Sequence, residues 1–387
     1  MKTKLSFFLL AILFLVGCKT SNPPDDPDDP NPPVNPPVTV VDSLGVSIST
    51  VSFTSEKDAS LIVIRTNKNW TASKNADWLS LSASSGTKNT GILIGASKND
   101  GFSRETTVSF SAGDKTAQIK VSQAGASKIS FKVNNVTFNM ILVEGGQFSM
   151  GSAEDQSSFG YPHTVQLGSY YISETEVTNE LWKAVKGTLP YTDHSESDKL
   201  LLPVSETTWN GITTDFIPAL NTSTGKTFRL PTEAEWEYAG LGGKKTHSYK
   251  YAGSATLDDV AWFYQNATSS KHNVKEKLPN ELGLYDMSGN VNEWCNDWYD
   301  YYYGWPIVNQ TVTVPTLETN PKGPTSGTKK IVRGGNFEND EFWGFSFCNV
   351  KYRSSIDPTG YDTYPGNPTV FFMSKNTGFR LALSISN

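Results

Sequence analysis

Short apolar runs rich in β-branched residues recur between residues 45 and 126. Clear examples are Ser60–Arg65, Gly91–Ile94 and Ala117–Ser122, and clusters of Gly, Asn, Ser and Asp separate them. Apolar and polar positions that alternate along a strand bury one face of a sheet and leave the other face in water. This pattern predicts an all-β, immunoglobulin-like sandwich of antiparallel strands over residues 45–126.

Beyond residue 129 the apolar pattern becomes irregular, and only short helices are predicted. They begin at Thr178, near Thr208 and at Thr232, where a threonine hydroxyl is suited to accept a hydrogen bond from the first helical turn. Thr232 and Glu235 together match a capping box. Few helices and long connections predict a loop-rich α+β domain over residues 129–387, in which the loops must be held by something other than a large regular core.

The N-terminus has the pattern of an export signal. Lys2 and Lys4 precede the apolar run Leu5–Val16, which is too short to cross a bilayer and is typical of a signal-peptide core. The run ends in Leu-Val-Gly-Cys, which resembles a bacterial lipobox with Cys18 as the lipidated residue. We therefore expect residues 1–17 to be a lipoprotein signal peptide, and acyl chains to anchor the protein in the outer membrane at the cell surface. A plain secretory signal that happens to contain a cysteine is the alternative.

Residues 18–44 are rich in proline and aspartate, as in the stretch NPPDDPDDPNPPVNPP. Proline favours an extended polyproline II conformation, and neighbouring carboxylates repel one another. This segment is therefore predicted to be a linker that holds the following domains away from the membrane.

Overall charge and composition narrow the range of partners only a little. The formal net charge of -6 gives no electrostatic reason to expect nucleic acid. The chain contains 10 Trp, 16 Tyr and 20 Phe. Rings in this number serve either the recognition of sugars and protein partners or a loop-rich core that needs large side chains, and composition alone leaves both open.

Four ordered motifs occupy the C-terminal two-thirds of the chain. They are RLPTEAEWEYAG at Arg229–Gly240, NELGLYDMSGNVNEWCNDWY at Asn280–Tyr299, VRGGNF at Val332–Phe337 and NTGFRLAL at Asn376–Leu383. Together they resemble the formylglycine-generating enzyme family, also called the sulfatase-modifying factor family. The resemblance implies a C-type-lectin-like fold, with extended loops on a small mixed sheet and two helices.

The segment before this domain carries a second resemblance. Trp70, Trp78 and the closing Val121–Gly125 resemble a BACON domain, a small immunoglobulin-like module. The name of that family implies carbohydrate association. At this spacing, however, the tryptophans fit a sandwich core better than a sugar platform, and we expect the segment to act as a spacer.

The motif around DMSGNVNEW implies a metal ion, because related enzymes enclose calcium with this block. Carried over position by position, the resemblance assigns the Asp286 carboxylate, the Gly289 and Val291 carbonyls and the Glu293 carboxylate to a structural Ca²⁺. Oxygen ligands of this kind suit a hard cation. In the alternative interpretation, Asp286 and Glu293 only accept hydrogen bonds within a turn.

The chemistry of the oxidase members depends on two cysteines that follow the RGG motif and bind monovalent copper. Here the corresponding positions are Asn339 and Gly344. We therefore expect no catalytic residue and no copper. Besides Cys18, the chain has Cys295 and Cys348. A disulfide between these two and a pair of buried thiols are both open, since exported proteins retain disulfides.

Between Phe337 and Gly378 the chain is crowded with aromatic and short polar side chains, a composition typical of adaptable recognition surfaces. The segment also resembles the variable region of ligand-displaying proteins that retroelements diversify. The candidate ligand-binding residues are Asn339, Asp340, Trp343, Phe345, Tyr361, Asp362 and Tyr364. An ordinary loop with buried aromatics is the alternative.

These expectations combine into one functional hypothesis with two rivals. The sequence indicates a cell-surface lipoprotein whose C-terminal domain is non-catalytic and binds a glycan or a protein ligand. The first rival is a formylglycine-generating oxidase that matures exported sulfatases. The second is a purely structural subunit of a surface assembly.

Overall fold

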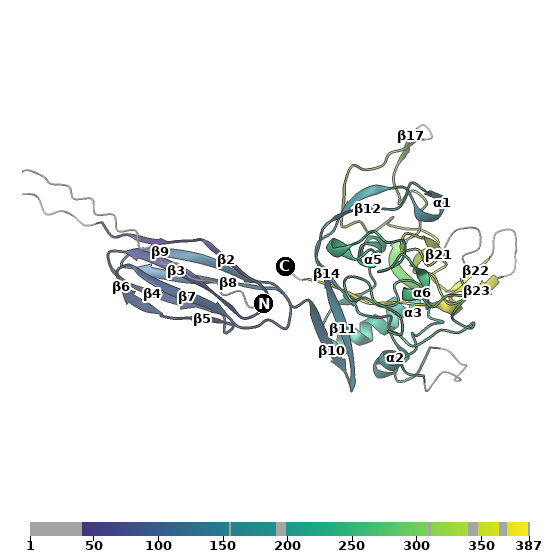
Figure 1. Ribbon diagram of the computed structural model, residues 1–387, viewed down its shortest axis with the longest axis horizontal. Coiled ribbons are helices and arrows are strands. Elements are labelled where there is room, and N and C mark those ends of the chain that lie inside the picture. Colours follow the sequence, from purple (N-terminus) through teal and green to yellow (C-terminus); the bar gives the residue numbers. More distant parts are fainter. Residues whose placement is uncertain are drawn as a thin grey trace, which may run out of the picture.

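Two bodies lie along the longest axis of the molecule: a slender one built only of strands, and a wider one that mixes helices, strands and loops (Figure 1). The structure, a computed structural model, describes residues 41–154, 156–190, 199–308, 311–339, 347–363 and 370–385. The last strand of the first body ends at Gln123, and the first strand of the second body begins at Lys128.

The N-terminal body is a two-layer sandwich. Its strands are β1 (Leu44–Val46), β2 (Thr50–Phe53), β3 (Asp58–Thr66), β4 (Asn69–Lys74), β5 (Leu79–Leu81), β6 (Ser85–Thr87), β7 (Thr90–Ala96), β8 (Arg104–Ala112) and β9 (Lys115–Gln123). One sheet has the order β1-β3-β7-β5 and the other the order β2-β9-β8-β4-β6. The sandwich prediction is confirmed, but β2 pairs with β9 in parallel, so the expectation of antiparallel strands throughout was wrong.

The sandwich core is filled as the alternation of apolar residues predicts. Ile62, Ile64, Phe110 and Ile119 are fully buried between the sheets, and so is Trp70. Gly86 packs so closely against the Trp70 indole that a Cβ there would lie 2.7 Å from the ring. Trp70 is therefore a core residue and offers no sugar platform.

A compact joint connects the two bodies. The Tyr171 hydroxyl donates to the Ala126 carbonyl at 2.7 Å, and the Phe102 ring meets the Tyr171 ring edge-on with centroids 5.5 Å apart. A Cβ at Gly125 would lie 2.7 Å from the Tyr171 hydroxyl. Aromatic packing of this kind, together with the buried hydrogen bond, fixes the sandwich against the C-terminal domain.

The C-terminal domain begins with a five-stranded sheet of order β10-β11-β14-β25-β15. These strands are β10 (Lys128–Val133), β11 (Val136–Val143), β14 (Tyr170–Ser173), β25 (Ala382–Ser384) and β15 (Phe228–Arg229). The hairpin β10–β11 faces the sandwich (Figure 1). Because β25 comes from the end of the chain and lies between β14 and β15, the sheet ties the two ends of the domain together.

Smaller sheets support the rest of the domain. A three-stranded sheet contains β12 (Gln147–Met150), β13 (His163–Gln166) and β19 (Glu318–Thr319), and a four-stranded sheet contains β21 (Ser354–Ile356), β20 (Lys330–Arg333), β16 (Asn292–Trp298) and β24 (Thr377–Gly378). Two hairpins, β17 (Ile307–Val308) with β18 (Thr311–Val312) and β22 (Tyr361–Thr363) with β23 (Val370–Phe372), complete the described strands. The resulting fold is loop-rich and α+β, as expected.

Helices begin where the capping residues predict. The described helices are α1 (Gln156–Phe159), α2 (Asn179–Lys186), α3 (Trp209–Gly211), η2 (Ile212–Phe216), α4 (Ile217–Thr224), α5 (Glu233–Gly240), η3 (Gly243–Lys245), α6 (Leu257–Val260) and η5 (Met373–Asn376). Thr178 accepts from the Leu181 N–H, and Thr232 and Glu235 form the reciprocal capping box at α5. The second predicted helix begins as α3 and continues through the π-helical turn η2 into α4. Pro218 falls in the first turn of α4, where proline is tolerated.

The helices bury aromatic faces against the sheets. Trp182 of α2 stacks on Phe216 at a centroid distance of 4.7 Å, and both pack against Phe379 beside the GFR motif. Trp236 of α5 is fully buried in a second cluster with Met287 and Ile331. Each cluster is completed by loop residues, so the packing of the loops and of the core cannot be separated.

Gly378 lies where a side chain has no room, because a Cβ would be 2.3 Å from the Val204 carbonyl oxygen. We expect Gly378→Ala to lower the free energy of unfolding of the C-terminal domain by about 3 kcal/mol. Gly168→Ala is the control, since its nearest neighbour would be a side-chain oxygen 3.7 Å away. Urea unfolding followed by tryptophan fluorescence measures both, and equal effects would contradict this account.

Candidate functional site

Three of the sequence motifs meet at one buried carboxylate, Glu293. Arg380 donates to it through Nε at 2.6 Å and through Nη2 at 2.7 Å, and the Trp236 indole N–H donates at 2.7 Å. Both charged groups are fully buried. Arg380 also donates to the carbonyls of Ser173 and Tyr285. The ion pair thus joins segments that are far apart in sequence, and its hydrogen bonds compensate for the loss of water.

A second buried carboxylate, Glu176, faces the same loop. Its Oε1 accepts the Val291 N–H at 3.1 Å, and its Oε2 accepts from the Asn290 amide at 2.8 Å. Burial raises the pKa of Glu176 well above its usual value, and the charges of Asp286 and Glu293 raise it further. The sequence analysis missed this residue because no local pattern distinguishes it from a surface glutamate.

The predicted calcium loop adopts backbone conformations that few residues favour. Asp286, Gly289 and Asn290 all have positive φ, at 56°, 79° and 60°. A Cβ at Gly289 would lie 2.3 Å from the Trp262 carbonyl, so only glycine fits there. The Asp286 carboxylate accepts the Lys275 N–H at 3.0 Å. Burial raises the pKa of Asp286 to about 6, although this hydrogen bond opposes the shift.

The negative charge around this loop favours a hard cation, but the side chains are not arranged as a complete set of metal ligands. Glu176, Asp286 and Glu293 are buried carboxylates, and Arg380 pairs with Glu293. Excess buried negative charge favours a cation or protons. Both oxygens of Glu293, however, are already engaged by Arg380. Among the residues that the structure describes, no group of three or more His, Cys, Asp or Glu side chains is arranged to hold a metal ion. The calcium assignment to Asp286, the Gly289 and Val291 carbonyls and Glu293 therefore stays a prediction, and Glu176 is a further buried carboxylate beside this loop.

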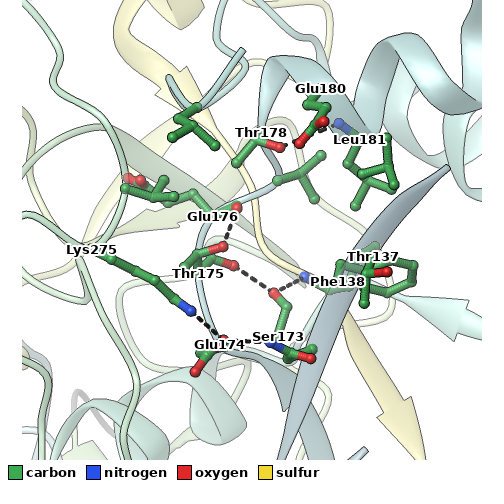
Figure 2. Close-up of a pocket in the computed structure, with 16 residues that line it drawn as sticks. Thr137, Phe138, Ser173, Glu174, Thr175, Glu176, Thr178, Glu180, Leu181 and Lys275 are labelled. Atoms are coloured by element: carbon green, nitrogen blue, oxygen red, sulfur yellow. Dashed lines mark hydrogen bonds and ion pairs between the residues drawn. The ribbon is translucent and has the colours of Figure 1, made fainter. Parts of the chain in front are cut away.

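A small pocket of about 160 Å³ opens beside Glu176 (Figure 2). One wall is β11 around Phe138, and the opposite wall is the segment from Ser173 to Leu181, with Lys275 at the rim (Figure 2). Glu174 accepts from Lys128 at 2.8 Å and from Lys275 at 2.5 Å. Burial would raise the pKa of Glu174, but these two lysines lower it. The Glu174 charge is thus paired, and none of the described lining residues is a cysteine or a histidine.

Asn339 occupies the first position at which the oxidase members have a thiol, and it is used structurally. Its side-chain oxygen accepts the Asn336 N–H at 2.8 Å, its own N–H donates to the Asn336 carbonyl at 3.0 Å, and its carbonyl accepts the Tyr264 N–H at 3.1 Å. These bonds close a tight turn directly after the RGG motif. Gly344, the second position, lies outside the described residues.

The two thiols of the domain are buried and do not form a disulfide, so the disulfide alternative was wrong. The physical reason is that they belong to separate hydrophobic clusters: Cys295 packs with Trp236 and Met287, and Cys348 packs with Phe263 and Tyr251. Burial raises the pKa of Cys295 well above its usual value, and the neighbouring Asp297 adds to the shift. A thiolate, which is the form that binds soft metal ions, is therefore disfavoured there.

The candidate ligand-binding residues are only partly described. Tyr361 begins the hairpin strand β22, and 53% of its surface is exposed. Asp362 follows it in β22, opposite Phe371 of β23. Asp340, Trp343, Phe345 and Tyr364 lie outside the described residues, as does Cys18. The convergence of these side chains on one surface therefore stays a prediction.

Comparison with known families supports both resemblances. The sulfatase-modifying factor enzyme 1-like domain matches residues 127–385, and the BACON domain, described as a putative binding domain, matches residues 68–124. The first match covers most of the chain and includes all the residues of the site described above.

Individual relatives differ in their named roles. The formylglycine-generating enzyme of Streptomyces coelicolor is 30% identical over 302 residues, which cover 60% of this chain and 87% of the enzyme. The chaperone protein LppX of Paenibacillus barcinonensis is 32% identical over 46% of this chain and 78% of its own length. The serine/threonine-protein kinase pkn1 of Chlamydia pneumoniae is 32% identical over 54% of this chain, but over only 35% of the kinase.

Among solved structures, Treponema denticola variable protein 1 is similar over its whole length. It has a TM-score of 0.54 and 29% sequence identity, and the match covers 67% of this chain and 99% of that protein. This chain is therefore similar to that protein in fold as well as in sequence.

Because Arg380 neutralises Glu293, removing both charges should destabilise the protein less than removing the Arg380 charge alone. Arg380→Met leaves buried carboxylates without their cation, and we expect it to lower the free energy of unfolding by about 3–5 kcal/mol. Adding Glu293→Gln to the same chain removes the orphaned charge and should recover at least about 1 kcal/mol of that loss. Urea unfolding at neutral pH measures both. A double variant less stable than Arg380→Met would contradict the charge-balance argument.

Proposed function

The chain belongs to the sulfatase-modifying factor enzyme 1-like family, and from this premise we propose that it is a non-catalytic, ligand-binding member displayed on the cell surface by a lipid anchor. The proposed ligand is a glycan or a protein. The proposed ligand surface is the segment between Phe337 and Gly378.

The main support for a non-catalytic function is the asparagine at position 339. Its side-chain oxygen accepts the Asn336 N–H in the turn after the RGG motif, and its main-chain carbonyl accepts the Tyr264 N–H. An amide is no ligand for monovalent copper, which prefers soft sulfur donors. Neither Cys295 nor Cys348 supplies a substitute, since each is buried in a different core cluster.

Two separate observations support the ligand-binding function. Tyr361 is a large aromatic side chain exposed on a hairpin, and tyrosine provides contact area at low entropic cost. Similarity to a solved protein named a variable protein agrees with the resemblance of this segment to diversified ligand-binding regions. The alternative, a structural subunit of a surface assembly, would use the same face for a permanent partner.

The proposed location rests on the N-terminal sequence alone. The run Leu5–Val16 and Cys18 supply the export signal and the lipidated residue, and residues 18–44 supply the linker. Within the described part of the chain, no helix is both long and apolar enough to span a bilayer.

The rival function is a formylglycine-generating oxidase, which the similarity to the Streptomyces coelicolor enzyme favours. The purified protein, incubated with copper, oxygen, a thiol reductant and a sulfatase-motif peptide, should leave the peptide cysteine unchanged by mass spectrometry. The related enzyme serves as the positive control under the same conditions. Formylglycine formation that disappears in Cys348→Ser or Cys295→Ser would establish the rival and remove the proposal.

Calcium in the Asp286 loop is proposed as a structural cofactor and has its own test. A ligand present at 100 times its Kd stabilises by about 2.7 kcal/mol, so millimolar CaCl₂ should raise the melting temperature by several degrees relative to EGTA. Asp286→Asn keeps an acceptor for Lys275 and tolerates positive φ, yet it should abolish the shift. The surface variant Asp215→Asn should keep it.

The same loop predicts a pH dependence when calcium is absent. Since the folded-state pKa of Asp286 is raised to about 6, its contribution to stability is present in acid and is lost as pH rises through that value. Calcium should therefore stabilise the protein more at pH 8 than at pH 5. Equal calcium shifts in wild type and Asp286→Asn would show that the ion binds elsewhere.

A further inference from the structure

A groove of about 490 Å³ lies at the edge of the five-stranded sheet, where Tyr170, Arg229 and Ser384 line it. Its walls come from the turn before β14, from the start of α5, from the loop around Asn320–Lys322 and from the end of β25. None of its lining residues falls between Phe337 and Gly378. Its volume is typical of small-molecule sites.

The one carboxylate in this groove is neutralised within the protein. Glu235 accepts from Arg229 at 2.6 Å and 2.7 Å, and it also accepts the Thr232 N–H. The remaining Arg229 hydrogen bonds go to the Leu230 carbonyl and to the Ser384 hydroxyl. Arg229 and Glu235 therefore form a fixed, neutral wall, and no other lining residue that the structure describes is acidic.

The groups that remain available are mostly donors. Asn320 is held at positive φ, and its Oδ1 accepts the Gly168 N–H at 2.8 Å, which leaves its amide N–H₂ to donate outward. The Ser384 hydroxyl oxygen receives two Arg229 N–H groups, so its own proton is left to donate. Lys322 is exposed, and within the described residues its ammonium has no ion-pair partner. The groove therefore carries one uncompensated positive charge and an excess of hydrogen-bond donors.

We propose that this groove is a second binding site, for the carboxylate and ring hydroxyls of a hexuronate, either free or at the end of an acidic glycan. The carboxylate pairs with Lys322 and with the amide N–H₂ of Asn320. Hydroxyl groups lie against Asn296, whose side-chain amide both donates and accepts, and against Ser384, whose hydroxyl donates. Leu230 and Ile385 provide apolar wall for the C–H face of the sugar ring.

The geometry favours a hexuronate over a neutral sugar or a simple anion. A neutral sugar leaves Lys322 unpaired, and a small carboxylate leaves most of the groove and the Ser384 hydroxyl unused. Charge-assisted hydrogen bonds are about twice as strong as neutral ones, so the ligand charge decides affinity here. The site goes beyond the proposed function because it requires nothing from the Phe337–Gly378 segment.

Isothermal titration of the purified protein tests the site with four probes: D-glucuronate, methyl β-D-glucuronide, D-glucose and acetate. Both glucuronates should bind, each at least about tenfold more tightly than glucose or acetate. The glucuronide stands for a chain end, and its binding distinguishes a glycan terminus from a free sugar. If the glucuronide fails to bind while free glucuronate binds, the glycan source is overturned.

Three variants test whether glucuronate binds in this groove. Lys322→Gln should weaken glucuronate about tenfold, and Asn320→Asp, which keeps the acceptor for Gly168 and the left-handed turn, should weaken it at least as much. Lys132→Gln on β10, an equal change of charge on an exposed lysine outside the groove, should leave affinity unchanged. Unchanged melting temperatures show that each variant is folded.

Three results would overturn the proposal: glucose or acetate binding as tightly as glucuronate, wild-type affinity in both Lys322→Gln and Asn320→Asp, or an equal loss in Lys132→Gln. If glucuronate binding is instead lost only in Tyr361→Ala, the sugar sits on the β22–β23 hairpin. That outcome removes this groove but leaves the proposed function intact.

Discussion

Buried arginine–carboxylate pairs hold the C-terminal domain together. Arg380 pairs with Glu293, and Arg333 and Arg353 both pair with Glu233, across sequence separations of 87, 100 and 120 residues. Each guanidinium also donates to main-chain carbonyls, such as those of Val350 and Ser173. A buried ion pair is tolerated only when its hydrogen bonds are complete, and this requirement fixes the carbonyls and therefore the loops that carry them. Four of these buried charges, Glu233, Glu293, Arg333 and Arg380, lie in motifs that also identify the family.

This constraint explains how a domain with short helices and small sheets orders so much irregular chain. In the function proposed above, the motifs do not line a reacting centre. They build the support beneath the surface on which related proteins place their chemistry, and function is added to that support by loops. Asn339 illustrates the separation: it lies directly after the RGG motif, where it closes a turn with Asn336 and has no thiol to offer. A scaffold that keeps its ion pairs can lose its redox residues without losing its fold.

Contacts between residues close in sequence were predictable from the sequence. Contacts between distant residues were predictable only where a family motif supplied them. The caps at Thr178 and Thr232 and the burial of Trp70 follow from nearest neighbours and alternation, and all were found as expected. Glu176 was missed because its partners, Asn290 and Val291, are more than a hundred residues away. The parallel pairing of β2 with β9 was missed for the same reason, since strand direction across a sandwich is set by connectivity and not by alternation. The status of Cys295 and Cys348 depended on which core cluster each one joins, which spacing does not encode.

We propose that this chain keeps the sulfatase-modifying factor scaffold but does not bind the copper that the oxidase reaction needs. Competition with the chelator bathocuproine disulfonate for Cu(I), carried out on the reduced protein, tests this most directly. We expect the chelator to remove all the copper, because the two thiols lie in separate core clusters and burial raises the pKa of Cys295. Retention of one Cu(I) per chain, lost on substitution of Cys295 or Cys348 by serine, would contradict the account.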